Sequence, residues 1–251
     1  MKLRVLGSGS SGNCYLLESD TECLVIEAGI PFKAVKKALN FNVSKIVGVV
    51  VSHSHKDHAG YCEEYIRAGI PVLQLTGKEK LFRECFKYFG QFSVRAFEHR
   101  DKFGRWLHSN NDGSECPCYG FYIVHRGMGA LVYASDTEYM RWKFPGTSHV
   151  LVESNYSMDL VDRDEPNYEH RLRGHMSIDT TCRFLMANNG PDLRNVILCH
   201  LSGQSADPER FQELAQKEVN SAIGFFCCLC HLESKSSLNI RHGYCWYSEK
   251  T

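Results

Sequence analysis

The fold is decided by residues 45–60, which read KIVGVVVSHSHKDHAG. Residues 46–51 are apolar and rich in β-branched side chains, which predicts a strand buried on both faces. This strand runs directly into four potential metal ligands: His53, His55, Asp57 and His58. Alternate residues of extended backbone point the same way, so His53 and His55 can reach one cation together. Asp57 and His58, where the chain turns toward the next helix, can face a second cation.

The ligand types narrow the choice of metal. Imidazole and carboxylate together favour zinc or manganese, with iron as a further possibility, whereas magnesium and calcium sites are built mainly from oxygen ligands. The alternative interpretation is four polar residues in a solvated loop. We favour the metal site because the spacing follows directly after an apolar strand.

Four side chains cannot complete two metal sites, so further ligands are expected at other strand ends. Asp136 follows an apolar run and can bridge two cations with its two oxygens; the alternative is a turn or helix-capping aspartate. His200 ends the apolar run 195–199, and we favour it as a ligand. His108 and His99 compete as the third ligand of the first cation, and His108 is preferred.

His175 lies just before a predicted helix and is harder to assign. It can be a ligand, a proton donor or a surface cap. We favour a proton donor or a phosphate contact.

The remaining pattern predicts an α/β protein, an αββα four-layer sandwich formed as a single domain over residues 1–251. The chain contains two β-rich blocks with outer helices, and a histidine-bearing loop closes each block. Strands are expected at 2–6, 14–17, 23–26, 45–51, 71–75, 119–125, 130–134, 149–152 and 195–199, within a strand-rich region from about 93 to 134, and helices at 32–39, 60–68, 77–88, 177–187 and 207–219.

Composition limits the possible partners. The formal net charge is +0, so the protein does not grip a polyanion by general electrostatics, and any nucleic-acid contact must be local. No stretch approaches the ~18 apolar residues of a membrane span, which predicts a cytoplasmic protein without membrane contact. The twelve cysteines are scattered through expected strands and helices, so we expect reduced, buried thiols. The oligomeric state is left open.

A set of motifs in a fixed order resembles the YycJ-like branch of the metallo-β-lactamase superfamily. The matching stretches are 7–13 (GSGSSGN), 26–29 (IEAG), 53–58 (HSHKDH), 134–136 (ASD), 153–155 (ESN), 174–177 (GHMS) and 200–202 (HLS). The resemblance implies the αββα sandwich, two divalent metal ions and nuclease activity on phosphodiesters. It also implies the ligand sets: His53, His55 and His108 for metal 1, and Asp57, His58 and His200 for metal 2, with Asp136 bridging.

The chain departs from the family pattern in three places. The region 99–118 aligns poorly with the family, so the resemblance alone does not fix His108 as a ligand. Glu27 stands where the family usually has an aspartate, so the support of the metal-binding loop is expected to differ. The C-terminal segment 220–251 matches nothing in the family. It carries Cys227, Cys228, Cys230, His231 and Cys245. Its spacing is not the usual Cys-x-x-Cys, so buried thiols are favoured over a small zinc site.

These residues predict a mechanism. Two cations that share a water lower its pKa toward neutrality and supply a hydroxide nucleophile, which Asp57 can orient. His175 can protonate the leaving oxygen. Arg171 and Arg173 can bring positive charge to the same place, or they are simply a solvated helix end. The backbone N–H groups and hydroxyls of Ser8–Asn13 suit oxyanion contacts at the rim.

Three functions remain open from the sequence. The favoured one is a nuclease or phosphodiesterase acting on DNA or RNA. The second is a metallohydrolase of a carbonyl substrate such as a thioester, lactone or β-lactam, because the same metal pair can perform that reaction. The least favoured is a metal-binding protein without catalytic activity.

Overall fold

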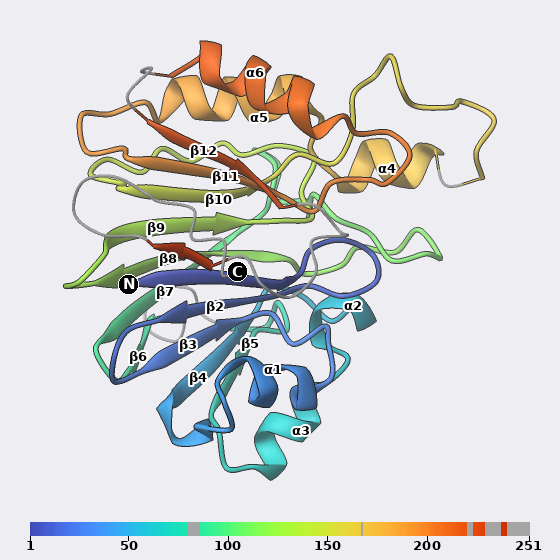
Figure 1. Cartoon of the computed structure of the whole chain (residues 1–251). Coiled ribbons are helices and arrows are strands. Elements are labelled where there is room, and N and C mark those ends of the chain that lie inside the picture. Colours follow the sequence, from blue (N-terminus) through green and yellow to red (C-terminus); the bar gives the residue numbers. More distant parts are fainter. Residues whose placement is uncertain (80–85, 167, 220–222, 229–236, 240–251) are drawn as a thin grey trace.

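Two β-sheets lie face to face, with helices on both outer surfaces (Figure 1). The structure is a computed structural model and describes residues 1–79, 86–166, 168–219, 223–228 and 237–239. The first sheet has the order β13 (Ser237–Asn239), β1 (Lys2–Gly7), β2 (Cys14–Glu18), β3 (Cys23–Ile26), β4 (Ile46–Val51), β5 (Val72–Gln74). The second has the order β12 (Gly224–Cys227), β11 (Asn195–Cys199), β10 (His149–Glu153), β9 (Gly129–Ala134), β8 (Tyr119–His125), β7 (Phe92–Glu98), β6 (Phe86–Phe89). The helices are α1 (Phe32–Ala38), the 3-10 turn η1 (Val43–Lys45), α2 (Lys56–Ala59), α3 (Cys62–Arg67), α4 (Tyr168–Gly174), α5 (Ile178–Ala187) and α6 (Pro208–Lys217).

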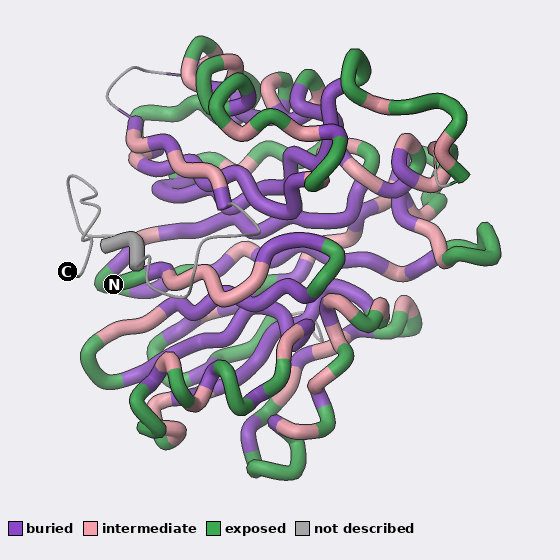
Figure 2. Tube along the Cα trace, turned by 45° about the vertical axis from the view of Figure 1, so that its right-hand side comes forward, coloured by how far each residue is buried: buried purple, intermediate pink, exposed green. Residues whose placement is uncertain are grey.

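The αββα order follows from strands that are apolar on both faces. In β2, Tyr15 and Leu17 point between the sheets, whereas Cys14 and Leu16 point outward against α1 and α3. In β10, Leu151 belongs to the central layer, and its two neighbours pack outward under α5 and α6. The strands are therefore buried along most of their length, and exposure is concentrated in loops and outer helix faces (Figure 2). A sheet covered on both faces needs such continuous apolar runs.

Parallel pairing brings the carboxyl ends of β9, β10 and β11, and those of β3, β4 and β5, to the same edge of each sheet. β9, β10 and β11 are mutually parallel neighbours, as are β3, β4 and β5 in the other sheet. Parallel neighbours end at the same edge of a sheet, where open α/β proteins place their ligand sites. The segments after these strands meet at the edge that carries α2 and α4 (Figure 1).

One predicted element is wrong. A helix was expected over 77–88, but residues 86–89 form β6, which pairs antiparallel with β7. The reason is tertiary: the aromatic side chains of Phe86, Tyr88 and Phe89 suit a strand once β7 offers a partner edge. Residues 80–85 lie outside the described residues. The other predicted strands and helices are confirmed to within about two residues.

Three other expectations concern the chain as a whole. The described cysteines are all free, and most are buried, as expected. Burial, for example, raises the pKa of the Cys23 thiol to about 12. Cys230, His231 and Cys245 lie outside the described residues. No helix in the described part of the chain is both long and apolar enough to cross a membrane. The cytoplasmic location and the single domain stay predictions.

Candidate metal centre

The seven residues expected as metal ligands lie together at one edge of the sandwich. One group contains His53, His55 and His108; a second contains Asp57, His58 and His200; Asp136 joins His53 and His58 in a third. Within each group, one possible ligand atom from every residue lies within 4.8 Å of the others. The groups share His53 and His58, so they form one continuous cluster.

Sharp turns after the strands aim these side chains inward. Asp136 follows β9 and His200 follows β11, and their φ angles are 56° and 53°. Glu27, directly after β3, has a φ of 65°. Left-handed backbone is uncommon for residues other than glycine, and such strained positions gather at functional sites. At three strand ends the fold therefore holds an unfavourable conformation that turns a chemically active side chain into the cluster.

In the first group, the ring nitrogens of two histidines point their lone pairs at each other. His108 Nδ1 donates to the Gly174 carbonyl oxygen at 3.0 Å, and His55 Nε2 donates to Asn110 Oδ1 at 3.0 Å. The opposite nitrogens, His108 Nε2 and His55 Nδ1, then face each other at only 3.1 Å. Burial lowers the pKa of His108 to about 3, so its ring is neutral. Two imidazole lone pairs at this distance repel each other, and a cation between them removes the repulsion.

His53 completes this group with an unpaired nitrogen. Its Nδ1 lies 2.9 Å from the Ser52 hydroxyl, whereas Nε2 is buried without a hydrogen-bond partner among the described residues. Burial, together with the neighbouring His58, holds the pKa of His53 well below its usual value. An unsatisfied buried polar atom is costly, and a metal ion that binds the neutral ring satisfies it.

The second group mixes imidazoles with carboxylates. His58 Nε2 lies 3.1 Å from Asp136 Oδ2 and 3.4 Å from Asp57 Oδ2. Burial alone would lower the pKa of His58, but Asp136 and Glu27 outweigh burial and hold it well above the usual value. Burial alone would raise the pKa of the Asp57 carboxyl, but His200 and His58 hold it well below the usual value. Without metal, His58 therefore carries a proton that a cation displaces on binding.

His200 points its second nitrogen into the same space. Its Nδ1 donates to Glu153 at 2.8 Å, and its Nε2 is buried, 3.8 Å from Asp57 Oδ2, without a hydrogen-bond partner among the described residues. Burial would lower its pKa, but Asp136, Asp57 and Glu153 raise it to about 10. The Nε2 atom of His200 thus lies beside the Asp57 carboxylate, while Nδ1 is held by Glu153.

Glu153 is a further residue of the centre, and the local sequence assigns it no role. Its side chain is fully buried, and Oε1 accepts from His175 Nδ1 at 2.6 Å as well as from His200. Its Oε2 accepts from the backbone N–H groups of Asp136 and Met176 at 2.9 and 3.2 Å. The signal was present, since Glu153 ends the apolar strand β10.

Glu27 plays the matching part in the first sheet. It is fully buried after β3, accepts from the Ser52 backbone N–H at 3.2 Å and from the Tyr133 hydroxyl at 2.9 Å, and lies 3.4 Å from His58 Nδ1. Such outer contacts orient metal-ligating histidines. The departure from aspartate at this position therefore keeps a carboxylate behind the metal-binding loop.

Charge balance shows that the donor set fits divalent cations. Four carboxylates face the cluster: Asp57, Asp136, Glu27 and Glu153. Their partners in the cluster are histidines, and Arg171, which lines the cleft, is already paired with Glu165 at 2.7 Å. Buried carboxylates need paired positive charge, and histidine with carboxylate is a donor set for transition-metal ions. The centre therefore binds divalent metal.

The cluster opens into a cleft of about 710 Å³. Gly9, Ser10 and Ser11 line its rim, as expected of the 7–13 stretch, and His175 lies in its wall. Arg173 lies elsewhere: it lines a neighbouring pocket and is an exposed partner of Glu169 at 3.4 Å. Arg173 therefore does not supply free positive charge beside His175 as expected.

His108 and His99 occupy different positions relative to the cluster. His108 lies within the first group, whereas His99 belongs to none of the clusters among the described residues. His99 is buried, and burial lowers its pKa to about 4. The position of His108 is therefore compatible with the preferred third ligand, whereas His99 is a buried histidine outside these groups.

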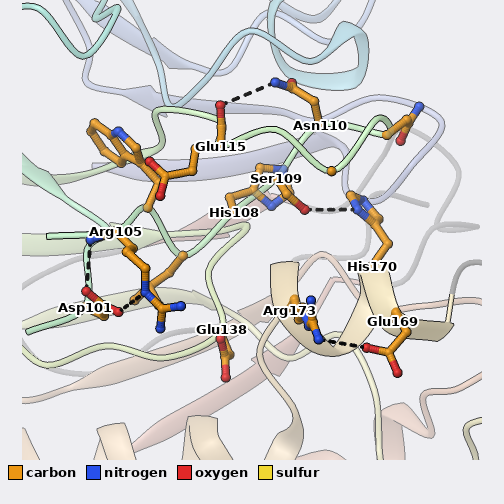
Figure 3. A pocket seen from close by; sticks show the side chains of 14 residues that line it. Asp101, Arg105, His108, Ser109, Asn110, Glu115, Glu138, Glu169, His170 and Arg173 are labelled. Atoms are coloured by element: carbon orange, nitrogen blue, oxygen red, sulfur yellow. Dashed lines mark hydrogen bonds and ion pairs between the residues drawn. The ribbon is translucent and has the colours of Figure 1, made fainter. Parts of the chain in front are cut away.

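A second pocket of about 330 Å³ adjoins the cleft (Figure 3). His170 lines both cavities, and its Nδ1 lies 3.4 Å from the Ser109 hydroxyl. The pocket carries the ion pairs Asp101–Arg105 and Glu169–Arg173, together with Glu115 and Glu138 (Figure 3). With this acidic lining it is poorly suited to a phosphate backbone.

Gly29 is expected to be essential for the position of the metal-binding loop. A Cβ at this residue would lie 1.7 Å from the Asp57 carbonyl oxygen, so Gly29→Ala must push the His53–His58 loop away. We expect metal affinity to fall at least about 10-fold, as for other outer supports of metal ligands. Titration with a chromogenic chelator measures this. Gly190→Ala, with nothing within 4 Å of its Cβ, is the control. Unchanged affinity in Gly29→Ala would contradict the loop geometry.

Comparison with known proteins agrees with the site. The profile of the metallo-beta-lactamase superfamily matches residues 7–80. The chain is 23% identical to exodeoxyribonuclease WalJ of Streptococcus pneumoniae, over 89% of this chain and 92% of that protein. It is 22% identical to exodeoxyribonuclease YycJ of Bacillus anthracis, over 87% and 88% of the two chains.

Solved structures show the same fold. The metallo-beta-lactamase fold protein YhfI from Bacillus subtilis superposes with a TM-score of 0.63 at 16% identity, over 98% of this chain and 99% of that one. The short form of human tRNase Z superposes with a TM-score of 0.56 at 13% identity, over 96% and 100%. The fold and the site define a metal-dependent hydrolase. Residues 7–80 match the metallo-beta-lactamase superfamily, and most of the chain is similar to relatives of its YycJ-like branch.

Proposed function

We propose that this protein is a dinuclear metal-dependent phosphodiesterase that cleaves nucleic acid, with zinc or manganese as the metals and iron as a further possibility. The observation that carries the proposal is that several histidine rings point one nitrogen into the cluster. The other nitrogen of each ring is already hydrogen-bonded to a neighbouring residue. The first metal would be held by His53, His55 and His108. The second would be held by Asp57, His58 and His200, with Asp136 shared between the two sites.

The protein's own residues supply the rest of the chemistry. When bound, the two cations lower the pKa of a shared water and polarise a phosphate oxygen. Asp57 is anchored for this role, because its backbone oxygen accepts from Asn13 N at 2.7 Å while its carboxylate faces the cleft. Glu153 holds His175 through Nδ1, which leaves His175 Nε2 as the atom that can protonate a leaving oxygen. Ser10 and Ser11 at the rim can contact the phosphate.

The substrate class rests on the relatives. Those that match most of the chain are named exodeoxyribonucleases, and a structural neighbour is a tRNase Z. A net charge of +0 supports weak, locally directed binding with shallow salt dependence. DNA or RNA is therefore the proposed substrate.

We expect two tightly bound metal ions per chain. Elemental analysis of carefully purified protein should show two, and His200→Ala should lose the second because the imidazole that ends the second group is gone. His125→Ala is the control, since His125 is a buried histidine paired with Glu22 outside the cluster. At most one tight metal, unchanged in His200→Ala, would contradict the dinuclear site.

A substrate panel tests the reaction itself. Zinc- or manganese-loaded protein is compared on a nitrophenyl phosphodiester, on labelled single- and double-stranded DNA and RNA, and on a thioester, a lactone and a chromogenic β-lactam. Nucleic-acid cleavage should require metal and slow in His175→Ala. Much faster turnover of a carbonyl substrate would overturn the phosphodiesterase proposal, and the fold and the metal sites would be unaffected.

A further inference from the structure

In the part of the chain that the structure describes, the outer face of β6, β7 and β8 is only partly covered: Phe97 and Tyr122 pack against the cluster under α5 and α6, whereas Arg95 is exposed. Outward-pointing residues of β9, β10 and β11 pack against α5 and α6, which lie over that part of the sheet (Figure 1). On β7 and β8 the outer positions are occupied instead by Ser93, Arg95, Phe97, Tyr122 and Val124. Arg95 is exposed and Tyr122 is only half-buried. Among the described residues, much of this face therefore stays accessible to a partner.

Aromatic side chains are arranged in register across this face. Phe86, Arg95 and Tyr122 are direct neighbours on three adjacent strands, so their side chains form one row. Phe86 is 41% exposed, and Tyr88, on the same face, is 73% exposed. Exposed apolar side chains that gather beside polar residues are typical of an interaction site.

Residues 141–145, which have no regular secondary structure, lie beside this face and enclose a cavity of about 510 Å³ with β7 and β8. Trp142 is 39% exposed, yet its Nε1 donates to the Glu98 carbonyl oxygen at 3.1 Å. Phe144 stacks on Tyr122 with ring centres 6.0 Å apart and planes inclined by 12°. The guanidinium of Arg141 lies 4.3 Å from the centre of the Trp142 ring. The exposed indole is thus held in one orientation before any ligand arrives.

Positive charge gathers at this cavity in a protein with no net charge. Arg95, Arg141 and Lys143 line it, and none of them forms an ion pair within the described residues. The carboxylate in the wall, Glu98, is paired with Arg100 at 3.2 Å. The surplus charge therefore favours an anionic ligand, and the fixed rings favour a planar one.

We propose that this face, defined by Phe86, Tyr88, Arg95, Tyr122, Trp142 and Lys143, binds single-stranded nucleic acid. Nucleobases stack on the aromatic rings, and Arg95 and Lys143 contact the phosphates; proteins that hold single strands combine these two features. The choice of a nucleic-acid strand over other aromatic anions rests on the proposed function. Arg141 also donates to the backbone oxygen of Asp101, which joins this segment to the wall of the pocket beside the metal cleft.

The test measures binding without cleavage. A fluorescent oligothymidylate is titrated in excess chelator, with anisotropy and Trp fluorescence as readouts. Trp142→Ala should weaken binding by about 5- to 150-fold, the effect of losing one stacked base, and Trp142→Phe should restore part of it. Arg95→Glu with Lys143→Glu should weaken binding and make its salt dependence shallower by roughly 0.7 for each phosphate that the variant no longer neutralises. Lys33→Glu with Lys37→Glu, two exposed lysines of α1 on the first sheet, matches the change in net charge and should bind normally.

Hydrolysis of a nitrophenyl phosphodiester separates this inference from the proposed function. That small substrate needs only the metal cleft, so its turnover should be unchanged in all these variants. Oligonucleotide affinity that is equal in the wild type and both face variants would overturn the inference and leave the nuclease proposal intact. Dimerisation in sedimentation experiments that Trp142→Ala abolishes, with unchanged oligonucleotide binding, would also overturn it, because a second copy would then cover the face.

Discussion

Asp57→Ala is expected to lower phosphodiesterase activity by more than ~10³-fold while the fold survives, because removing a central catalytic group commonly costs this much. The carboxylate lies near both His58 and His200 and is held ionised, and in the proposed function it would hold the second metal and orient the nucleophile. The loop itself should stay in place, since the backbone of residue 57, not its side chain, accepts from Asn13 N. Initial rates on a phosphodiester with saturating metal measure the effect.

Thermal unfolding in excess chelator provides the structural check. Without metal, Asp57→Ala and the wild type should unfold at similar temperatures. Asp159→Ala removes a carboxylate that pairs with Arg210 outside the cluster, and it should keep its activity. If Asp57→Ala keeps more than about a tenth of the wild-type rate, the role assigned to Asp57 is wrong.

Glu153→Gln should be the most damaging change outside the seven ligands. An amide has one oxygen where the carboxylate has two acceptors. If that oxygen faces His175 and His200, the amide N–H₂ group opposes the backbone N–H groups of Asp136 and Met176; in the other orientation it opposes both imidazoles. Each buried donor without an acceptor costs about 1–3 kcal/mol. A histidine that instead turns its N–H toward the metal can no longer bind it.

The expected result is a loss of several kcal/mol in the free energy of unfolding, together with a fall in metal affinity of about 10- to 100-fold. Denaturant unfolding and chelator competition measure the two effects. Glu22→Gln is a matched control, because Glu22 is also a buried glutamate with hydrogen-bond partners. It accepts from Gln91 N and lies 3.1 Å from His125 Nε2, outside the metal-binding cluster. It should lose stability but keep its metal affinity. Equal metal affinity in Glu153→Gln and the wild type would refute the role of Glu153.

Much of the centre follows from local sequence because strand geometry is local. A run of β-branched residues predicts a buried strand, and the two-residue alternation places His53 and His55 on one side without knowledge of any partner. Asp136 and His200 could be predicted as ligands for the same reason, since each follows a short apolar run. The layered fold was predictable because strands that are apolar on both faces need cover on both.

What the tertiary structure alone decided depends on residues far apart in the chain. His108 rather than His99 joins His55 because the Gly174 carbonyl, 66 residues away, holds its ring. The role of Glu153 depends on contacts from three other segments, and the strand at 86–89 depends on the edge that β7 offers. Local sequence determines which way a side chain points along its own strand. Which groups it meets is set by the register and packing of distant segments, and only the folded chain contains that information.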